Sequence, residues 1–210
     1  MSEDLGFVHR FEPGPGPLTL LVLHGTGGNE NDLVGLARAL DPDANLLSPR
    51  GRVLENGMPR FFRRLAMGVF DVEDLIARTH ELVRFVDQAV GAYRLDAGRI
   101  VAVGYSNGAN IAASMLLLHP QTLSAAALLH AMPPFEPESV PDLSGKPILL
   151  TAGRHDSMVP GELSDKLAQM YSEAGAEVAL EWMPGGHELT QQEIKVAADW
   201  LAQVKGKTDR

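Results

Sequence analysis

The residues Gly104-Tyr105-Ser106-Asn107-Gly108 match the pattern G-x-S-x-G, which places a serine nucleophile on a sharp turn between a strand and a helix. An apolar run ends at Gly104, and small residues suited to a tightly packed helix begin at Ala109. Glycine on both sides leaves room for a serine in a strained backbone conformation. We therefore expect the Ser106 hydroxyl to project above a sheet as a nucleophile. The alternative is an ordinary glycine-serine loop.

A serine hydroxyl is a weak nucleophile unless a neighbouring base takes its proton. In chains with this type of turn, an acid and then a histidine follow the serine in the sequence. His187 comes directly after Gly185-Gly186, on a predicted loop between the last strand and the last helix. We expect it to be the general base. The competing interpretation is a surface loop histidine.

Asp156 is the expected acid of this group. It follows the apolar run 147–152, at the carboxyl edge where parallel sheets hold their sites. Its expected task is to fix the tautomer of His187 and to stabilise the imidazolium. Asp142 and Glu181 are rivals, although Asp142 precedes its strand and Glu181 lies inside one. The alternative role for Asp156 is the N-cap of the next helix.

The run His24-Gly25-Thr26-Gly27-Gly28 directly follows an apolar strand. A glycine-rich turn lets backbone N–H groups point into a site, where they can stabilise a developing oxyanion. We expect the N–H groups of Thr26 and Asn107 to do this, with His24 bracing the loop. Phosphate binding is the alternative, but the run lacks a P-loop lysine and does not match G-x-G-x-x-G.

The bulk composition limits the partners. The chain has 210 residues and a net charge of −9, which disfavours nucleic acid and anionic membranes. Cysteine is absent, so disulfides and thiolate metal sites are excluded, and neither a metal nor a cofactor is predicted. The N-terminus lacks the pattern of a secretory signal, and no apolar run is long enough to span a bilayer. We expect a cytoplasmic protein, and a homodimer is left open.

Short apolar runs alternate with segments of helical period, which is typical of βαβ units and a mostly parallel sheet. The predicted strands are 7–11, 18–24, 45–48, 99–104, 125–130, 147–152 and 178–182. The predicted helices are 30–40, 71–93, 107–118, 161–174 and 188–204, and the stretch 50–70 fits no regular element. These patterns predict one α/β domain over residues 1–210, a three-layer α/β/α sandwich around about seven strands with a minimal cap.

Four segments together resemble the phospholipase/carboxylesterase family of α/β-hydrolases: 23–28, 104–108, Gly153-x-x-Asp156-x-x-Val159-Pro160 and Gly186-His187. The segment 48–51 with 55–57 resembles its short bacterial carboxylesterase branch. The resemblance runs from about residue 18 to 187 and implies an α/β-hydrolase fold that cleaves small carboxylic esters. These relatives typically carry leucine where Thr26 stands, so we expect short or medium acyl groups.

The stretch 50–70 combines methionine and phenylalanine side chains with five arginines and a single acid, Glu55. Over a site, such a surface can receive an acyl chain or, through an arginine fork, a carboxylate. The alternatives are that the apolar side chains anchor the loop on the core and that the arginines pair with acids. The side chains expected to contact substrate are His24, Arg50, Met58, Phe61, Phe62 and Met158.

Together these residues predict two-step acyl transfer, in which a small-molecule ester acylates Ser106 and water then releases the acid. An acyl thioesterase or a lysophospholipase is the alternative within the same chemistry. Because a fold does not define a function, a lyase, a perhydrolase and a non-catalytic ligand-binding protein are the rivals of other classes.

Overall fold

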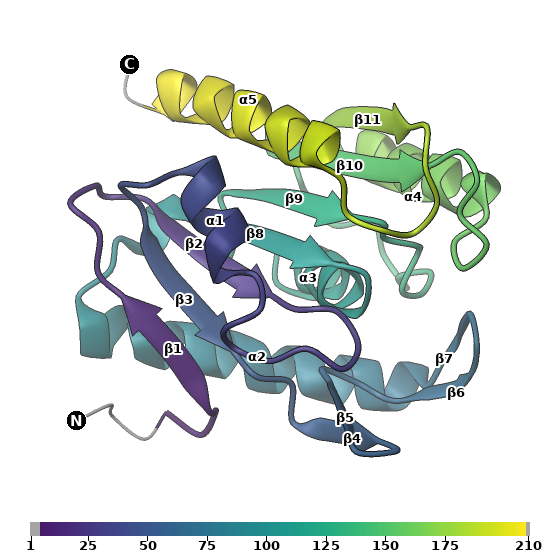
Figure 1. Ribbon diagram of the computed structural model, residues 1–210, viewed down its shortest axis with the longest axis horizontal. Coiled ribbons are helices and arrows are strands. Elements are labelled where there is room, and N and C mark those ends of the chain that lie inside the picture. The colour runs from purple at the N-terminus through teal and green to yellow at the C-terminus, as the bar shows by residue number, and fades with distance from the viewer. Residues whose placement is uncertain (1–4, 209–210) are drawn as a thin grey trace.

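A seven-stranded sheet forms the centre of the computed structural model, which describes residues 5–208 (Figure 1). The strands of this sheet are β1 (His9–Glu12), β2 (Thr19–Leu23), β3 (Asn45–Pro49), β8 (Ile100–Tyr105), β9 (Ala125–Leu129), β10 (Pro147–Gly153) and β11 (Glu177–Met183). Their spatial order is β1-β3-β2-β8-β9-β10-β11. β1 runs antiparallel to β3, and the other neighbouring pairs are parallel. The predicted fold class is confirmed.

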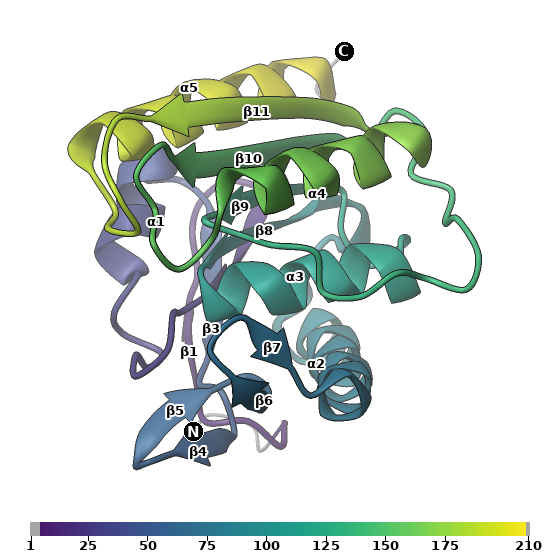
Figure 2. The same ribbon diagram turned by 90° about the vertical axis from the view of Figure 1, so that its right-hand side faces the viewer.

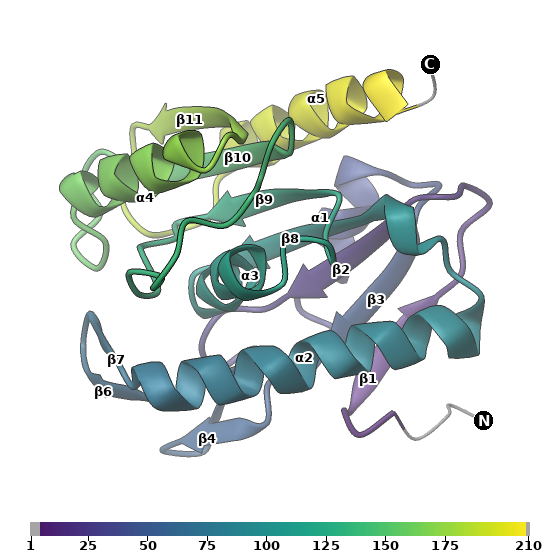
Figure 3. The same ribbon diagram turned by 180° about the vertical axis from the view of Figure 1, so that it is seen from behind.

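Helices cover both faces of this sheet. They are α1 (Val34–Leu40), α2 (Val72–Tyr93), α3 (Asn107–Leu118), α4 (Gly161–Glu173) and α5 (Gln191–Thr208). α1 and α5 contact each other on one face, while α2, α3 and α4 lie on the other (Figure 3), and Figure 2 shows the two layers from the side. Within residues 5–208, no helix combines the length and apolarity needed to cross a membrane.

The sheet divides the core into two halves. Leu21 and Leu23 of β2 pack on the side of α2 and α3, whereas Leu20 and Val22 pack on the side of α1 and α5. Successive side chains of a strand point to opposite faces, so a strand covered on both faces must be apolar throughout. This is why the apolar runs in the sequence predicted the strands well.

Two predicted helix starts differ from the structure. The structure begins α1 at Val34 instead of 30, because Asn29, Asn31 and Asp32 form a turn in which side chains take the backbone N–H groups. α5 begins at Gln191 instead of 188. Just before it, the Thr190 hydroxyl accepts from the N–H of Glu193 at 3.2 Å, as in a capping box.

The stretch 50–70 is more ordered than the sequence predicted. It forms two short hairpins, β4 (Val53–Glu55) with β5 (Met58–Arg60) and β6 (Arg64–Ala66) with β7 (Val69–Phe70). Asn56 and Gly57 both have positive φ, the backbone that a tight two-residue hairpin turn requires. The second hairpin lies at the end of the molecule toward which β8, β9 and β10 point (Figure 1).

Candidate active site

Ser106 occupies the turn from β8 into α3 with φ 53° and ψ −114°, a strained conformation for any residue other than glycine. Two backbone hydrogen bonds hold the turn. The Ser106 N–H donates to the Leu129 carbonyl at 2.8 Å, and the Ser106 carbonyl accepts from the Asn110 N–H at 2.9 Å. The strain is therefore supported from both β9 and α3.

The glycines of this turn are required by close backbone contact. A Cβ atom on Gly108 would lie 2.1 Å from the Leu23 carbonyl oxygen, and one on Gly104 would lie 2.7 Å from the backbone nitrogen of Ala109. Neither distance is compatible with a side chain. The first turn of α3 consequently packs directly on the end of β2, beside the glycine-rich loop that follows that strand.

Three predicted side chains meet in one hydrogen-bonded chain at this edge. The His187 Nε2 atom lies 2.8 Å from the Ser106 Oγ atom, and the His187 Nδ1 atom lies 2.7 Å from the Asp156 Oδ2 atom. They come from the β8–α3 turn, the β10–α4 loop and the β11–α5 loop. The rival acids lie elsewhere, since Asp142 accepts from the Ser144 N–H and Glu181 is exposed on β11.

The Asp156 side chain is buried, with 1% of its surface exposed. Its Oδ1 atom accepts from the N–H groups of Met158 at 2.8 Å and Val159 at 2.9 Å. Burial opposes ionisation of this carboxyl, but these N–H groups and His187 outweigh it and lower the pKa of Asp156. Because α4 begins at Gly161, Asp156 is not its N-cap.

The loop that carries His187 is fixed by the residue before Ser106. The Tyr105 hydroxyl donates to the His187 carbonyl at 2.7 Å, and the two rings lie 5.6 Å apart. His155, next to Asp156 in the sequence, is exposed. The histidine that reaches Ser106 is thus held by backbone and ring contacts.

A cavity of about 40 Å³ opens beside Ser106. Its lining residues are Thr26, Arg60, Arg64, Met67, Gly68, Phe70, Ser106, Asn107, Asn110, Met132, Met158, Val159 and His187. The N–H groups of Gly27 and Gly28 donate to Pro59 and Gly25, whereas those of Thr26 and Asn107 have no acceptor in the described chain. Two residues whose N–H groups have no acceptor in the described chain therefore line the cavity that contains the serine.

Of the apolar side chains expected to contact substrate, Met158 lines the cavity. Phe61 and Phe62 do not, because both rings are buried in the core under the hairpins. Met58 is exposed on β5 and lies outside the cavity lining. The alternative interpretation of these side chains, anchoring of the loop on the core, is correct for the two phenylalanines.

The two polar residues expected to contact substrate hold loops instead. The Nε2 atom of His24 accepts from the Gly51 N–H at 2.9 Å, so this buried ring links the glycine-rich loop to the segment that follows β3. Burial lowers the pKa of His24. Arg50 forms a bidentate pair with Glu30, at 2.6 and 2.7 Å, and does not line the cavity.

Two other arginines of the stretch border the cavity, and the sequence did not single them out. Arg60 is 3% exposed, and its Nη1 atom donates to the Thr26 hydroxyl at 2.5 Å. Its Nε atom lies 3.1 Å from Glu55, which also binds Arg64 at 2.8 Å. Burial and the charge of Arg64 lower the pKa of Arg60. Two guanidinium groups thus share one carboxylate.

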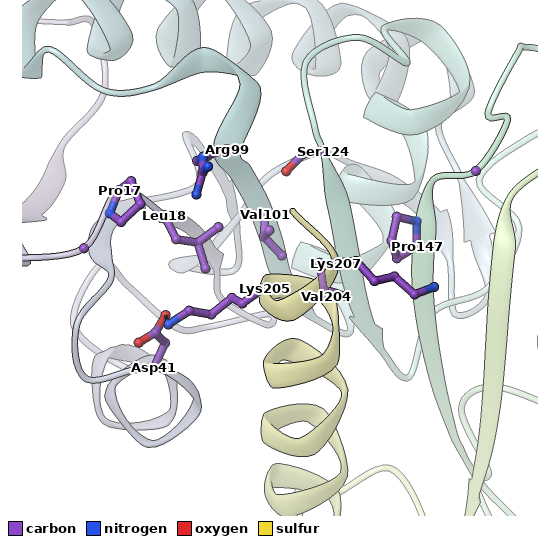
Figure 4. Close-up of a pocket in the computed structure, with 12 residues that line it drawn as sticks. Pro17, Leu18, Asp41, Arg99, Val101, Ser124, Pro147, Val204, Lys205 and Lys207 are labelled. Carbon is purple, nitrogen blue, oxygen red and sulfur yellow. Dashed lines mark hydrogen bonds and ion pairs between the residues drawn. The ribbon is translucent and has the colours of Figure 1, made fainter. Parts of the chain in front are cut away.

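A larger cavity, of about 280 Å³, lies at the opposite edge of the sheet, among the amino ends of the strands (Figure 4). Its cations are engaged, since Lys205 pairs with Asp41 at 2.6 Å and Lys207 pairs with Glu177 at 2.6 Å. The Ser124 hydroxyl there donates to a backbone carbonyl. Among residues 5–208, no histidine lines this cavity.

A strained serine on the strand-to-helix turn of a parallel sheet, within hydrogen-bond reach of a histidine, defines the class of α/β-hydrolases. Residues 14–205 match the model of the family described as Phospholipase/Carboxylesterase, and the chain belongs to this family.

Relatives of known name and structure agree with this assignment. MhqD of Bacillus subtilis (strain 168), a protein named as a hydrolase, is 49% identical over 196 residues, which are 93% of this chain and 98% of MhqD. The crystal structure of the Bacillus cereus carboxylesterase is 47% identical, with 92% of each chain covered and a TM-score of 0.91. A structure of YahD with malic acid is 32% identical, covers 92% of this chain and 97% of YahD, and has a TM-score of 0.88.

The contact of Gly108 with β2 leads to a prediction for Gly108→Ala. We expect this variant to lose about 3 kcal/mol of unfolding free energy in urea, because the new methyl group forces α3 away from β2. Gly91→Ala is the matched control: it lies inside α2 with nothing within 4 Å of the added Cβ, and alanine favours a helix. A Gly108→Ala protein as stable as the wild type would contradict the proposed packing.

Proposed function

We propose that this protein is a carboxylesterase that hydrolyses small carboxylic esters through an acyl-serine intermediate. The observation that carries the proposal is the chain of hydrogen bonds from Ser106 through His187 to Asp156, at 2.8 and 2.7 Å. Membership of the phospholipase/carboxylesterase family supports the same reaction class. The residues form a nucleophile, a base and an acid that orients the base.

The reaction follows from these positions. As the Ser106 oxygen attacks the ester carbonyl, the Nε2 atom of His187 takes its proton, and Asp156 stabilises the resulting imidazolium. The N–H groups of Thr26 and Asn107 bind the oxyanion. His187 then gives the proton to the departing alcohol. Water repeats these steps on the acyl-serine and releases the carboxylic acid.

Replacement of the nucleophile tests the mechanism. We expect Ser106→Ala to lower kcat for a short aryl ester on the order of 10⁴-fold while the protein stays folded. Loss of the hydroxyl removes the covalent step itself. A fluorophosphonate should label wild-type Ser106 and leave the variant unlabelled, with the exposed Ser157→Ala as the control. Labelling that persists in Ser106→Ala would refute the assignment.

The same assay tests the other two residues. His187→Ala is expected to be nearly as damaging as the serine change, and Asp156→Asn severe but milder. Asp142→Asn, on an exposed turn, provides the control for the acid. If Asp142→Asn were the crippling change, Asp156 would not be the acid.

The small cavity supports short acyl groups as substrates. Its volume of about 40 Å³ has room for roughly three water-sized groups. Methionine, valine and phenylalanine side chains provide apolar contact for a few methylene groups. We expect kcat/KM for a four-carbon acyl ester to exceed that for a sixteen-carbon one by about tenfold or more. The check is a series of aryl esters of graded acyl length, in which a rise toward long chains overturns the proposal.

A carboxylate on the acyl group is the finer substrate class that we propose. Arg60 and Arg64 border the cavity and share Glu55. Two cations thus face one carboxylate, which leaves this wall of the cavity with an excess of one positive charge. A guanidinium in such a partly buried place binds a carboxylate more strongly than one in open solvent. Malic acid, the ligand in the YahD structure, is itself a dicarboxylic acid. Arg64 is the less buried of the two and is better placed to contact the ligand.

Two matched esters test this preference. Ethyl hydrogen succinate carries the charge, and ethyl butyrate has a neutral four-carbon acyl group. We expect Arg64→Gln to lower kcat/KM for the succinate ester by about tenfold and that for the butyrate ester by less than about twofold. Arg52→Gln, whose arginine pairs with Glu81 away from the cavity, is the control. An equal effect of Arg64→Gln on both esters would show that Arg64 only supports the hairpin.

A further inference from the structure

His130 lies directly behind the proposed acid. It follows the last residue of β9 with φ 57°, a left-handed conformation that costs free energy in a histidine. Its N–H donates to the Thr151 carbonyl at 3.0 Å, and its side chain is 1% exposed. A strained, buried histidine at the catalytic edge calls for a physical reason, and no local sequence pattern had pointed to it.

Both ring nitrogens of His130 face carboxylates. The Nδ1 atom lies 3.0 Å from the Asp156 Oδ2 atom, the same oxygen that faces His187. The Nε2 atom lies 3.2 Å from Glu193, whose side chain is 0% exposed. A continuous chain therefore extends from Ser106 through His187, Asp156 and His130 to Glu193.

This arrangement favours the doubly protonated ring. A neutral imidazole has one N–H donor, whereas the imidazolium has two and can donate to both carboxylates. Two buried carboxylates are costly unless a cation compensates them. Burial alone would lower the pKa of His130, but Glu193 and Asp156 outweigh burial and raise it.

Glu193 has a second, local role that must be separated from this one. It forms a capping box with Thr190 at the start of α5, and a capping glutamate needs no buried partner. Here the Thr151 hydroxyl donates to the Oε1 atom of Glu193, which also faces His130. The glutamate is thus held in the interior from β10 as well as from its own helix.

Three other titratable groups face His130 or its partners. The His187 ring lies 5.0 Å away and the Tyr105 ring 5.9 Å away. Burial, together with the charges of Glu193, Asp156 and Glu188, raises the pKa of Tyr105, so this phenol stays neutral near neutral pH. Glu188 lies on the His187 loop, and hydrogen bonds from backbone N–H groups lower its pKa. The positive charge beside Asp156, on the side of Glu193, is therefore that of His130.

We propose that His130 is a positioning residue, an imidazolium clamped between Glu193 and Asp156 that orients the acid toward His187 and sets its negative charge. The proposal rests on the proposed esterase function. His130 contacts neither the substrate nor the reacting atoms. It acts through Asp156, whose Oδ2 atom it holds beside the Nδ1 atom of His187.

Opposite charge changes test this role. His130→Gln removes the positive charge, and Glu193→Gln removes the negative charge while keeping a residue that suits a capping box. We expect each variant to lower kcat on the order of tenfold with little change in KM. The acid limb of kcat/KM should move up by about one pH unit in His130→Gln and down by about one in Glu193→Gln. The double variant should return it close to the wild-type position.

A purely structural role cannot give shifts of opposite sign. If both single variants keep the wild-type pH profile, or move it in the same direction, the proposal is overturned. His80→Gln is the control for a histidine change, because His80 bonds to His119, the residue that follows α3, and neither histidine lines the cavity. His80→Gln should leave the pH profile of kcat/KM unchanged.

A measurement on the wild-type protein without substrate separates this proposal from the proposed function. It also tests the proposal if one of the variants fails to fold. In ¹⁵N-histidine NMR of the wild type, both His130 nitrogens should be protonated near neutral pH. Glu193→Gln should lower the pH at which the imidazolium of His130 loses one of its two ring protons. A neutral His130 near pH 7 overturns the proposal whether or not esters are cleaved. If His130 is an imidazolium but the Ser106→Ala variant keeps full activity, the esterase mechanism is refuted and the proposal for the charge of His130 is not.

Discussion

The direct contact between the first turn of α3 and the end of β2 is the constraint on which the rest of the site depends. Gly108 lies so close to the Leu23 carbonyl that no side chain fits between them, and the start of α3 therefore lies against the loop that contains Thr26. The Ser106 backbone must then turn through a left-handed conformation. Ser106, Thr26 and Asn107 consequently line one small cavity. A larger residue in this turn would separate groups that must act on the same carbonyl.

The second organising feature is buried charge. Asp156 receives hydrogen bonds from the backbone on one oxygen and faces two histidines with the other. Glu193 provides the next negative charge beyond His130. Groups held in this way need not reorganise when charge develops during a reaction, and this is the main source of electrostatic catalysis. Buried charges and the strained backbone of Ser106 and His130 lower the stability of the fold. Such costs are typical of functional sites.

Local patterns predicted what local forces determine. The strands covered on both faces were recognisable as apolar runs, and the proposed Ser106, Asp156 and His187 stand at the ends of such runs. Asn56-Gly57 is a sequence signal for a tight hairpin turn, and both residues have the positive φ of such a turn. Long-range pairing could not be foreseen. Arg50 and Arg52 pair with Glu30 and Glu81 from distant elements and do not border the cavity, whereas Arg60 and Arg64 share Glu55 and do. His130 and Glu193 are brought together only by the crossovers of the sheet.

The hairpin β6–β7 contributes Met67, Gly68 and Phe70 to the cavity, yet Leu65, Met67 and Val69 are largely exposed. Much of one cavity wall is therefore an exposed hairpin, while the groups proposed for bond cleavage stand on the loops that directly follow strands of the buried sheet. Insertions or deletions at the tip of this hairpin would reshape the wall without disturbing the strand order or the serine turn. Related chains can thus diverge in the compounds they accept during descent while inheriting the same catalytic framework unchanged.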